Sequence, residues 1–365
     1  MFRVSFRGLH FLRLADKAEM SGEDHFHHVR DFGYFEVPGF LTSSHAYDNV
    51  DAVPWYQLKA LHLEHPTLDQ LNEAMEGKIF IPQPFAGAAA DSGFLITKFM
   101  VLQVVVVLFC ILIFRGLAKR IQSGQPAPGR FWNFWEALAL FIRDEVVRPT
   151  IGDHAEGHHE DHHANVQFDG HGGHVIAAHD DGNAAVLAHP ADRYLPFIWS
   201  CFFYVLLCNL LGAIPSLGSA TGSISVTAVL ALCSLGATFM AGTRVMGVKG
   251  FFGNLVPETG VGGTGGVILS CVMFVIELFG FLIKHSILAL RLFGNIMGGH
   301  TAVGVILAFI AQAAHSSFAL WGVVTVGSVL LQVGIGILEL LVAVLQAYVF
   351  SFLATIFLAG AIHKH

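Results

Sequence analysis

The stretch VILSCVMFVIELFGFLIKHSILALRLFGNIMGGHTAVGVILAFI, residues 267–310, decides the fold class. It is apolar almost throughout, contains no proline and holds few charged side chains. A bilayer core takes roughly 20 apolar helical residues, whereas this stretch would be about 66 Å long as one helix. It therefore either breaks into two spans or runs as one strongly tilted helix, and the polar residues inside it favour the tilted helix.

Four further stretches have the length and composition of membrane spans: residues 95–117, 195–214, 224–241 and 323–362. Only 13% of the 365 residues are charged, against about 25% in soluble domains. Only helices and closed barrels satisfy every backbone polar group in lipid. We therefore expect an all-α polytopic membrane protein with about five membrane-embedded helices, the last two long. No basic face points to nucleic acid.

The alternation of apolar and polar segments predicts seven regions along the chain. They are an N-terminal extension with little regular structure (1–94), a first transmembrane helix (95–118), a linker with an amphipathic helix (119–150), a His-rich insertion (151–192), a transmembrane hairpin (193–244), a Gly-rich loop (245–265) and a final helical hairpin (266–365).

Positive charges at the ends of the spans predict the orientation in the membrane. Arg115 and Lys119 follow the first predicted span, and Arg244 and Lys249 follow the third. Cytoplasmic flanks carry the excess of Lys and Arg, so we expect the N-terminus outside and the C-terminus in the cytoplasm. The first residues mix arginine with aromatic side chains, which predicts no cleavable signal peptide, and Met20 is an alternative start.

Residues 131–148 have the spacing of an amphipathic helix. Apolar residues recur at helical intervals on one side, and they are Trp132, Trp135, Ala139, Ile142 and Val146. Tryptophan at the edge of an apolar face is typical of a helix lying in the membrane interface. A soluble helix packed on a partner protein is the alternative.

Residues 153–189 contain nine histidines and several acids but no Lys or Arg. Such a tract has no apolar core and predicts a disordered cytoplasmic insertion. Neutral imidazoles beside carboxylates bind zinc, nickel or copper loosely. No defined tetrahedral spacing occurs, so we expect no dedicated metal site and no cofactor.

The charged side chains within residues 267–310 are the candidates for function. Glu277, Lys284 and Arg291 are seven residues apart and share one helical stripe, which Asn295 joins. His300 points to roughly the opposite side. Charges at membrane depth are costly and mark an ion path or a pair inside a bundle. Lys284 can have a structural role, with its ammonium group extended to the membrane surface, and Glu277 can be its ion-pair partner. Arg291 is hard to explain by a structural role.

The final apolar segment repeats this pattern on a second heptad-spaced stripe of Gln332, Glu339 and Gln346. Glycines before His300, at 294, 298 and 299, allow another helix to approach closely. His300 and Glu339 either exchange protons or form a structural pair.

These residues carry a resemblance. The sequence from Arg291 to Asn295, followed by Gly298-Gly299-His300, resembles the signature of the F-type ATP synthase a subunit family, the A chain of the membrane Fo sector. Residues 209–215 and 339–350 are similar to two further family motifs, and Glu277 sits where the family has an acid. The match covers about residues 95–362. Many members have the acid and the imidazole exchanged between the His300 and Glu339 positions, and an Asp or Asn near the turn where this chain has Thr221.

The resemblance implies a stator that is not catalytic alone. In this family two half-channels load and unload carboxylates of a rotating c-ring, which couples proton flow to ATP synthesis on other subunits. The last two helices would pack as a tilted hairpin against that ring. The implied partners are the c-ring, the b subunits of the peripheral stalk, the F1 sector indirectly and the lipid bilayer, in a bacterial inner membrane. The implied site residues are Arg291 as the essential fixed cation, with Glu277, His300, Glu339, Gln346 and Asn295 along the proton path.

Two rival functions follow from other features. A secondary transporter would show internal repeats and Gly- or Pro-broken helices in both halves, and no such repeat is seen. A metal-handling membrane protein built around the His tract would need ligands inside the spans, where the imidazoles are the single residues His285, His300 and His315.

Overall fold

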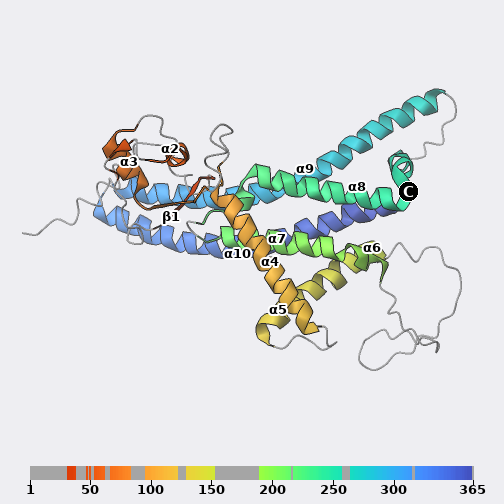
Figure 1. The fold of residues 1–365 in the computed structure, drawn as a ribbon, viewed down its shortest axis with the longest axis horizontal. Coiled ribbons are helices and arrows are strands. Elements are labelled where there is room, and N and C mark those ends of the chain that lie inside the picture. Colours follow the sequence, from red (N-terminus) through yellow and green to blue (C-terminus); the bar gives the residue numbers. More distant parts are fainter. Residues whose placement is uncertain are drawn as a thin grey trace, which may run out of the picture. The chain divides into compact units, whose positions relative to one another are not determined.

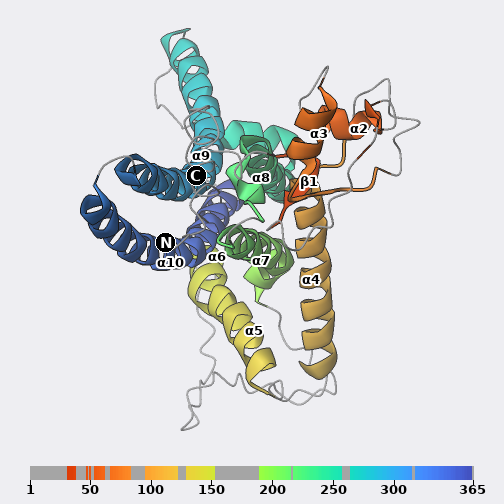
Figure 2. The same ribbon diagram turned by 90° about the vertical axis from the view of Figure 1, so that its left-hand side faces the viewer.

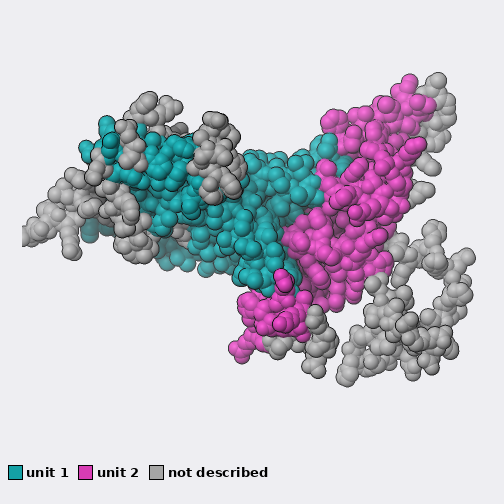
Figure 3. Space-filling model, viewed as in Figure 1, with its two compact units in different colours: residues 1–114, 203–234, 280–350 teal, residues 115–202, 235–279, 351–365 magenta. Residues whose placement is uncertain are grey.

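The computed structural model divides into two compact units (Figure 3). Unit 1 comprises residues 1–114, 203–234 and 280–350, and unit 2 comprises residues 115–202, 235–279 and 351–365. The structure describes residues 31–37, 47, 49–50, 53–61, 66–83, 95–121, 129–152, 189–214, 217–256, 264–314 and 317–363.

Helices dominate these residues (Figure 1). Five of the described helices are long and apolar enough to cross a membrane, namely α4 (Lys98–Ile121), α7 (Leu195–Gly212), α8 (Ile224–Asn254), α9 (Thr264–Ala314) and α10 (Phe318–Ile362). The predicted fold class, an all-α polytopic membrane protein whose last two helices are long, is confirmed.

The last two helices bury little of their apolar surface inside the chain. Within the chain, only 6% of the apolar stretch of α9 and 11% of that of α10 is buried, against 61% in the span that holds α7. An apolar surface of this kind needs lipid or a protein partner to cover it. α9 is one continuous helix from Thr264 to Ala314, so the alternative of two separate spans is wrong.

α8 extends further than the predicted hairpin. It reaches Asn254 across a break at Gly247, whose φ of 73° is a left-handed conformation that glycine adopts without steric cost. The helix therefore covers the first part of the segment that the sequence predicted as a Gly-rich loop, and residues 257–263 lie outside the described residues.

The N-terminal extension contains regular structure, so the expectation of little such structure was wrong. β1 (Tyr34–Glu36) pairs antiparallel with β2 (Lys78–Phe80), and Phe35 lies opposite Ile79. Two short helices, α2 (Trp55–Ala60) and α3 (Leu68–Met75), lie between the strands in sequence. Pro54 directly precedes α2, at an element boundary where the missing N–H of a proline costs least.

A small aromatic core holds this extension together. The rings of Phe32 and Tyr34 stack at 5.0 Å, and Phe80 packs against them with the buried Ala60. Burial raises the pKa of the Tyr34 phenol. The extension is fastened to α4, because the N–H of Lys98 donates to the carbonyl of Phe32 at 2.8 Å. Figures 1 and 2 accordingly show β1, α2 and α3 at the N-terminal end of α4.

In unit 2 the predicted amphipathic helix is α5 (Arg130–Phe141), continued by a π-helical turn, η4 (Ile142–Val147), and α6 (Arg148–Gly152). Four of its five predicted apolar positions are buried, at residues 135, 139, 142 and 146. Phe131 and Phe134 are 54% and 56% exposed. The helix is confirmed, and its place in the membrane interface stays a prediction.

Hydrogen bonds and an ion pair also join the elements of unit 2. The Trp199 ring N–H donates to the carbonyl of Ala139 at 2.9 Å. Arg148 forms a two-bond ion pair with Asp192, at 3.0 and 2.9 Å, and this contact raises the pKa of Arg148. Of the predicted His-rich insertion, residues 151–192, residues 153–188 lie outside the described residues, and so does the alternative start at Met20.

Candidate functional site

Arg291 lies near the middle of α9 with its side chain exposed. Its neighbours Leu292 and Ile296 are buried, at 0% and 2% exposure, and hold the opposite face of the helix against the rest of unit 1. The ion pairs formed among the described residues do not include Arg291. An arginine side chain that faces lipid near the middle of a membrane helix is costly. We therefore expect a polar group of another molecule to lie against this face of α9.

The other residues of the predicted stripe are also on the surface of the chain. Lys284, in unit 1, and Glu277, in unit 2, are both exposed, and Asn295 is half-buried. The stripe that begins at Glu277 therefore presents charge outward along much of α9.

Glu339 of α10 packs directly on the backbone of α9. A Cβ atom added to Gly299 would lie 2.9 Å from Glu339 Oε1 and 3.1 Å from its Cδ. A larger residue here would force the Glu339 carboxylate to shift. The structure therefore brings Glu339 beside Gly299, the residue that precedes the half-buried His300.

Three buried polar atoms lie along the same stripe of α10. Gln332 Nε2, Glu339 Oε1 and Gln346 Nε2 have no hydrogen-bond partner within the part of the chain that the structure describes. Leaving a buried polar atom unpaired costs on the order of 1–3 kcal/mol. Side chains at this spacing therefore offer donors and acceptors that the fold itself does not use.

A second polar cluster contacts α10 from the neighbouring α7 and the turn that follows it, and its side chains are hydrogen-bonded. Thr221 Oγ1 donates to Asn209 Oδ1 at 2.9 Å, and Asn209 Nδ2 donates to the carbonyl of Ala343 at 3.3 Å. The hydroxyl of Ser219 lies 2.8 Å from that of Thr221, and it acts as the donor because the Thr221 proton already goes to Asn209. We call Asn209, Ser219 and Thr221 the turn network.

The turn network joins three elements of unit 1. Asn209 belongs to α7, Thr221 to the 3₁₀ turn η7 (Ala220–Gly222) and Ala343 to α10. All three side chains of the network are at most 1% exposed. Ser219 reaches its place only because position 212 is glycine, since a Cβ there would clash with the serine side chain. The network therefore fixes α10 between Glu339 and Gln346.

Comparison with known proteins decides the family. The family model of the ATP synthase A chain matches residues 179–359, which hold Arg291, Glu339 and the turn network. The "ATP synthase subunit a" of Chlorobium phaeobacteroides is 31% identical over 293 residues, covering 79% of this chain and 71% of its own length. This chain belongs to the ATP synthase subunit a family.

Two further relatives carry the same description. The "ATP synthase subunit a" of Anaeromyxobacter dehalogenans (strain 2CP-1 / ATCC BAA-258) is 32% identical over 252 residues, 67% of this chain. This chain spans only 52% of the length of that relative. The protein of the same description from Anaeromyxobacter sp. (strain Fw109-5) is 27% identical over 346 residues, covering 93% of this chain and 70% of its own length. The predicted family and the multi-pass membrane class are confirmed.

Thr221 and Ser219 are the residues whose role the sequence did not reveal. The family resemblance pointed to an Asp or Asn near this turn, and the chain has hydroxyl side chains there instead, Ser219 and Thr221 among them. The available signal was this group of hydroxyl residues inside the turn of an otherwise apolar hairpin. Their pairing with Asn209 depends on the fold of the turn, which spacing alone does not give.

Proposed function

We propose that this member of the ATP synthase subunit a family forms the stationary ion path of the Fo sector. Arg291 is the fixed cation that faces a rotating c-ring, and two half-channels on either side of it load and unload the ring carboxylates. One observation supports the proposal: Arg291 is exposed in the middle of α9, while Glu339, whose Oε1 has no partner among the described residues, packs on Gly299 of the same helix.

The electrostatics explain why a fixed cation is needed. A ring carboxylate that faces lipid must be neutral, because an ionised one is too costly to bury. Close to Arg291 the carboxylate can ionise, with a gain of about 4 kcal/mol at 4 Å in an effective dielectric near 20. A guanidinium stays charged in proteins because its charge is delocalised over a planar group, whereas a buried lysine can lose its proton.

Titratable side chains along the two half-channels exchange protons with the ring carboxylates. We assign His300 and Glu339 to the half-channel open to the outside, with hydrogen bonds from Gln346 and Asn295. Glu277, exposed on α9, is the candidate for the other half-channel. A fixed charge between the two half-channels repels protons that would cross directly, so ions travel around on the ring.

The membrane potential supplies the energy. Each elementary charge that crosses 100 mV delivers about 2.3 kcal/mol, so several charges per turn drive nucleotide chemistry on other subunits. We assign to this chain the role of a translocating stator rather than a site of ATP synthesis. Its partners are then the c-ring, the b subunits of the peripheral stalk and, indirectly, the F1 sector. The orientation is that of a bacterial inner-membrane protein with its N-terminus outside and its C-terminus in the cytoplasm.

ATP-driven proton pumping in inverted membrane vesicles tests the proposal. We expect Arg291→Ala to reduce pumping to background while the ring still co-purifies with the complex. Lys284→Ala is the matched control, because it removes an equally exposed cation from the same stripe, and we expect it to keep at least about half of the native rate. Native pumping by an assembled Arg291→Ala complex would contradict the proposal.

A further inference from the structure

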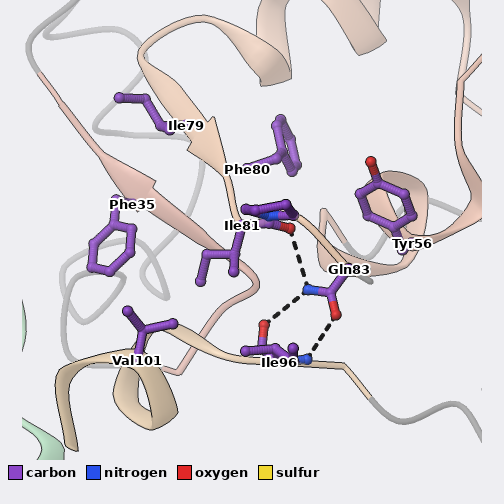
Figure 4. A pocket seen from close by; sticks show the side chains of 9 residues that line it. Phe35, Tyr56, Ile79, Phe80, Ile81, Gln83, Ile96 and Val101 are labelled. Carbon is purple, nitrogen blue, oxygen red and sulfur yellow. Dashed lines mark hydrogen bonds between the residues drawn. The ribbon is translucent and has the colours of Figure 1, made fainter. Parts of the chain in front are cut away.

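The N-terminal extension carries an open pocket of about 790 Å³ (Figure 4). The side chains that line it come from β1, α2, the segment through β2 and the start of α4, and nearly all are apolar: Phe35, Tyr56, Ile79, Phe80, Ile81, Pro82, Gln83, Ile96 and Val101. Ile79 is 50% exposed at the rim. Pockets of this size and lining hold ligands that bury mostly hydrocarbon.

The few polar groups in the pocket leave little hydrogen-bonding capacity for a polar ligand. The Gln83 amide closes one end: its oxygen accepts the N–H of Ile96 at 2.9 Å, and its nitrogen donates to the carbonyls of Ile96 and Ile81 at 3.0 and 3.3 Å (Figure 4). Both ends of this amide are thus used by the backbone. The other polar group is the Tyr56 hydroxyl, so the interior favours hydrocarbon over a polar ligand.

The pocket is continuous with the lipid-facing side of α4. Val101 lines the pocket from the first turn of this membrane helix. The same helical face continues as Val104, Val105, Leu108 and Leu112, which are between 48% and 69% exposed. A pocket that opens onto this exposed apolar stripe lies at the edge of the hydrocarbon core of the bilayer.

The neighbouring helix α2 has the composition of a membrane interface. Trp55 adjoins the Tyr56 of the pocket, and the Lys59 ammonium lies 5.9 Å from the centre of the Trp55 ring. Tryptophan and tyrosine gather at the level of the lipid headgroups, where their rings meet hydrocarbon and their polar ends meet water. This composition places the pocket mouth at the same level.

We propose that this pocket binds an acyl chain of a membrane phospholipid, with the glycerol and headgroup left at the mouth beside α2. The chain enters along the α4 stripe and ends against the closed amide of Gln83. The bound lipid fastens the N-terminal extension to the bilayer surface and sets the depth of α4. This site is separate from the ion path and does not rest on it.

Photocrosslinking in the intact complex tests the proposal. Ile79→p-benzoylphenylalanine places a benzophenone at the exposed rim, where it inserts into a nearby C–H bond on illumination. The complex is illuminated after purification and an extensive detergent wash, and mass spectrometry of this chain identifies the adduct. We expect a phospholipid joined through its acyl chain. Phe35→p-benzoylphenylalanine is the second probe position should the first variant fail to assemble.

Two control positions separate a bound lipid from the surrounding bilayer. Leu112→p-benzoylphenylalanine lies on the same stripe of α4 and contacts bulk lipid, so its adduct is expected to fall at least fivefold through the wash while that at Ile79 persists. Asp69→p-benzoylphenylalanine, exposed on α3, is expected to give no lipid adduct. The proposal is overturned if the Ile79 adduct disappears with that at Leu112. It is equally overturned if the Ile79 probe crosslinks a peptide of this chain or of another protein, or forms no adduct.

Discussion

Two polar clusters, one on α10 and one that contacts α10, differ in whether their polar atoms have hydrogen-bond partners. In the turn network, Asn209, Thr221 and Ser219 each contact a protein partner at 2.8–3.3 Å. On the stripe of Gln332, Glu339 and Gln346, each side chain has a buried polar atom without a partner among the described residues. Both clusters belong to unit 1, and the turn network contacts α10 at Ala343, between Glu339 and Gln346.

We propose that this difference separates structural from functional polar groups in this helix bundle. Interhelical hydrogen bonds in membranes contribute about 0.6–2 kcal/mol each, so a paired cluster stabilises the arrangement of helices. An unpaired buried group opposes folding by on the order of 1–3 kcal/mol. Because ionisable groups inside membrane segments mark proton and ion paths, we assign the unpaired stripe to such a path.

The largest expected effect comes from changing the acid of the unpaired stripe. Glu339→His leaves two imidazoles and no carboxylate beside α9, and we expect ATP-driven pumping to fall about 100-fold, as for the loss of a general acid or base. The double exchange, His300→Glu with Glu339→His, restores one acid and one imidazole. We expect it to recover pumping to within about tenfold of native. A double variant no better than the single one would show that the two positions do not work as a pair.

A smaller effect is expected from crowding the carboxylate without removing it. Gly299→Ala places a Cβ 2.9 Å from Glu339 Oε1, so the carboxylate must shift, and we expect pumping to fall about tenfold. Gly298→Ala is the matched control, because a Cβ there meets nothing within 4 Å. Equal pumping rates in the two variants would mean that the position of the carboxylate is not critical.

The paired cluster should respond in stability rather than in rate. Asn209→Leu removes the acceptor of the buried Thr221 hydroxyl and the donor to the Ala343 carbonyl, and we expect a loss of about 1–3 kcal/mol. Thermal unfolding of the purified complex measures this loss, with Thr221→Ser as the control that keeps a hydroxyl. Pumping per assembled complex should stay within about threefold of native. A rate loss as large as that of Glu339→His would place Asn209 on the ion path.

The smallest effect is expected in unit 2, at a paired polar group on the surface. Arg148 and Asp192 are 35% and 23% exposed, respectively, and exposed ion pairs contribute about 0–1 kcal/mol. Arg148→Ala should therefore change the thermal unfolding temperature only slightly and leave pumping as in the native complex. A clear loss of pumping would give this pair a role beyond stability.

Long-range pairing marks the limit of what the sequence predicts. The helices α9 and α10 follow from uninterrupted apolar runs, and Arg291 stands out because charge is rare at membrane depth. The N-terminal sheet was missed because its core joins Phe32 and Tyr34 to Phe80 across a long separation in sequence. Non-local contacts of this kind leave no local pattern, since strand propensity depends on the neighbours that a strand packs against.

The same limit applies within the candidate site. The spacing of Glu339 on its stripe was visible in the sequence, whereas its close contact with Gly299 depends on how α9 and α10 meet. The turn network likewise needs the fold of η7 to bring Thr221 to Asn209.

The most direct test of the central claim is passive proton conduction through vesicles stripped of the catalytic sector. It is measured for Glu339→Gln and Asn209→Leu at equal amounts of assembled complex. Our account predicts that Glu339→Gln conducts at least about tenfold less than native with unchanged thermal stability. It predicts that Asn209→Leu conducts nearly as native but unfolds at a lower temperature. Native conduction by Glu339→Gln would contradict the claim that the unpaired stripe of α10 carries the ions.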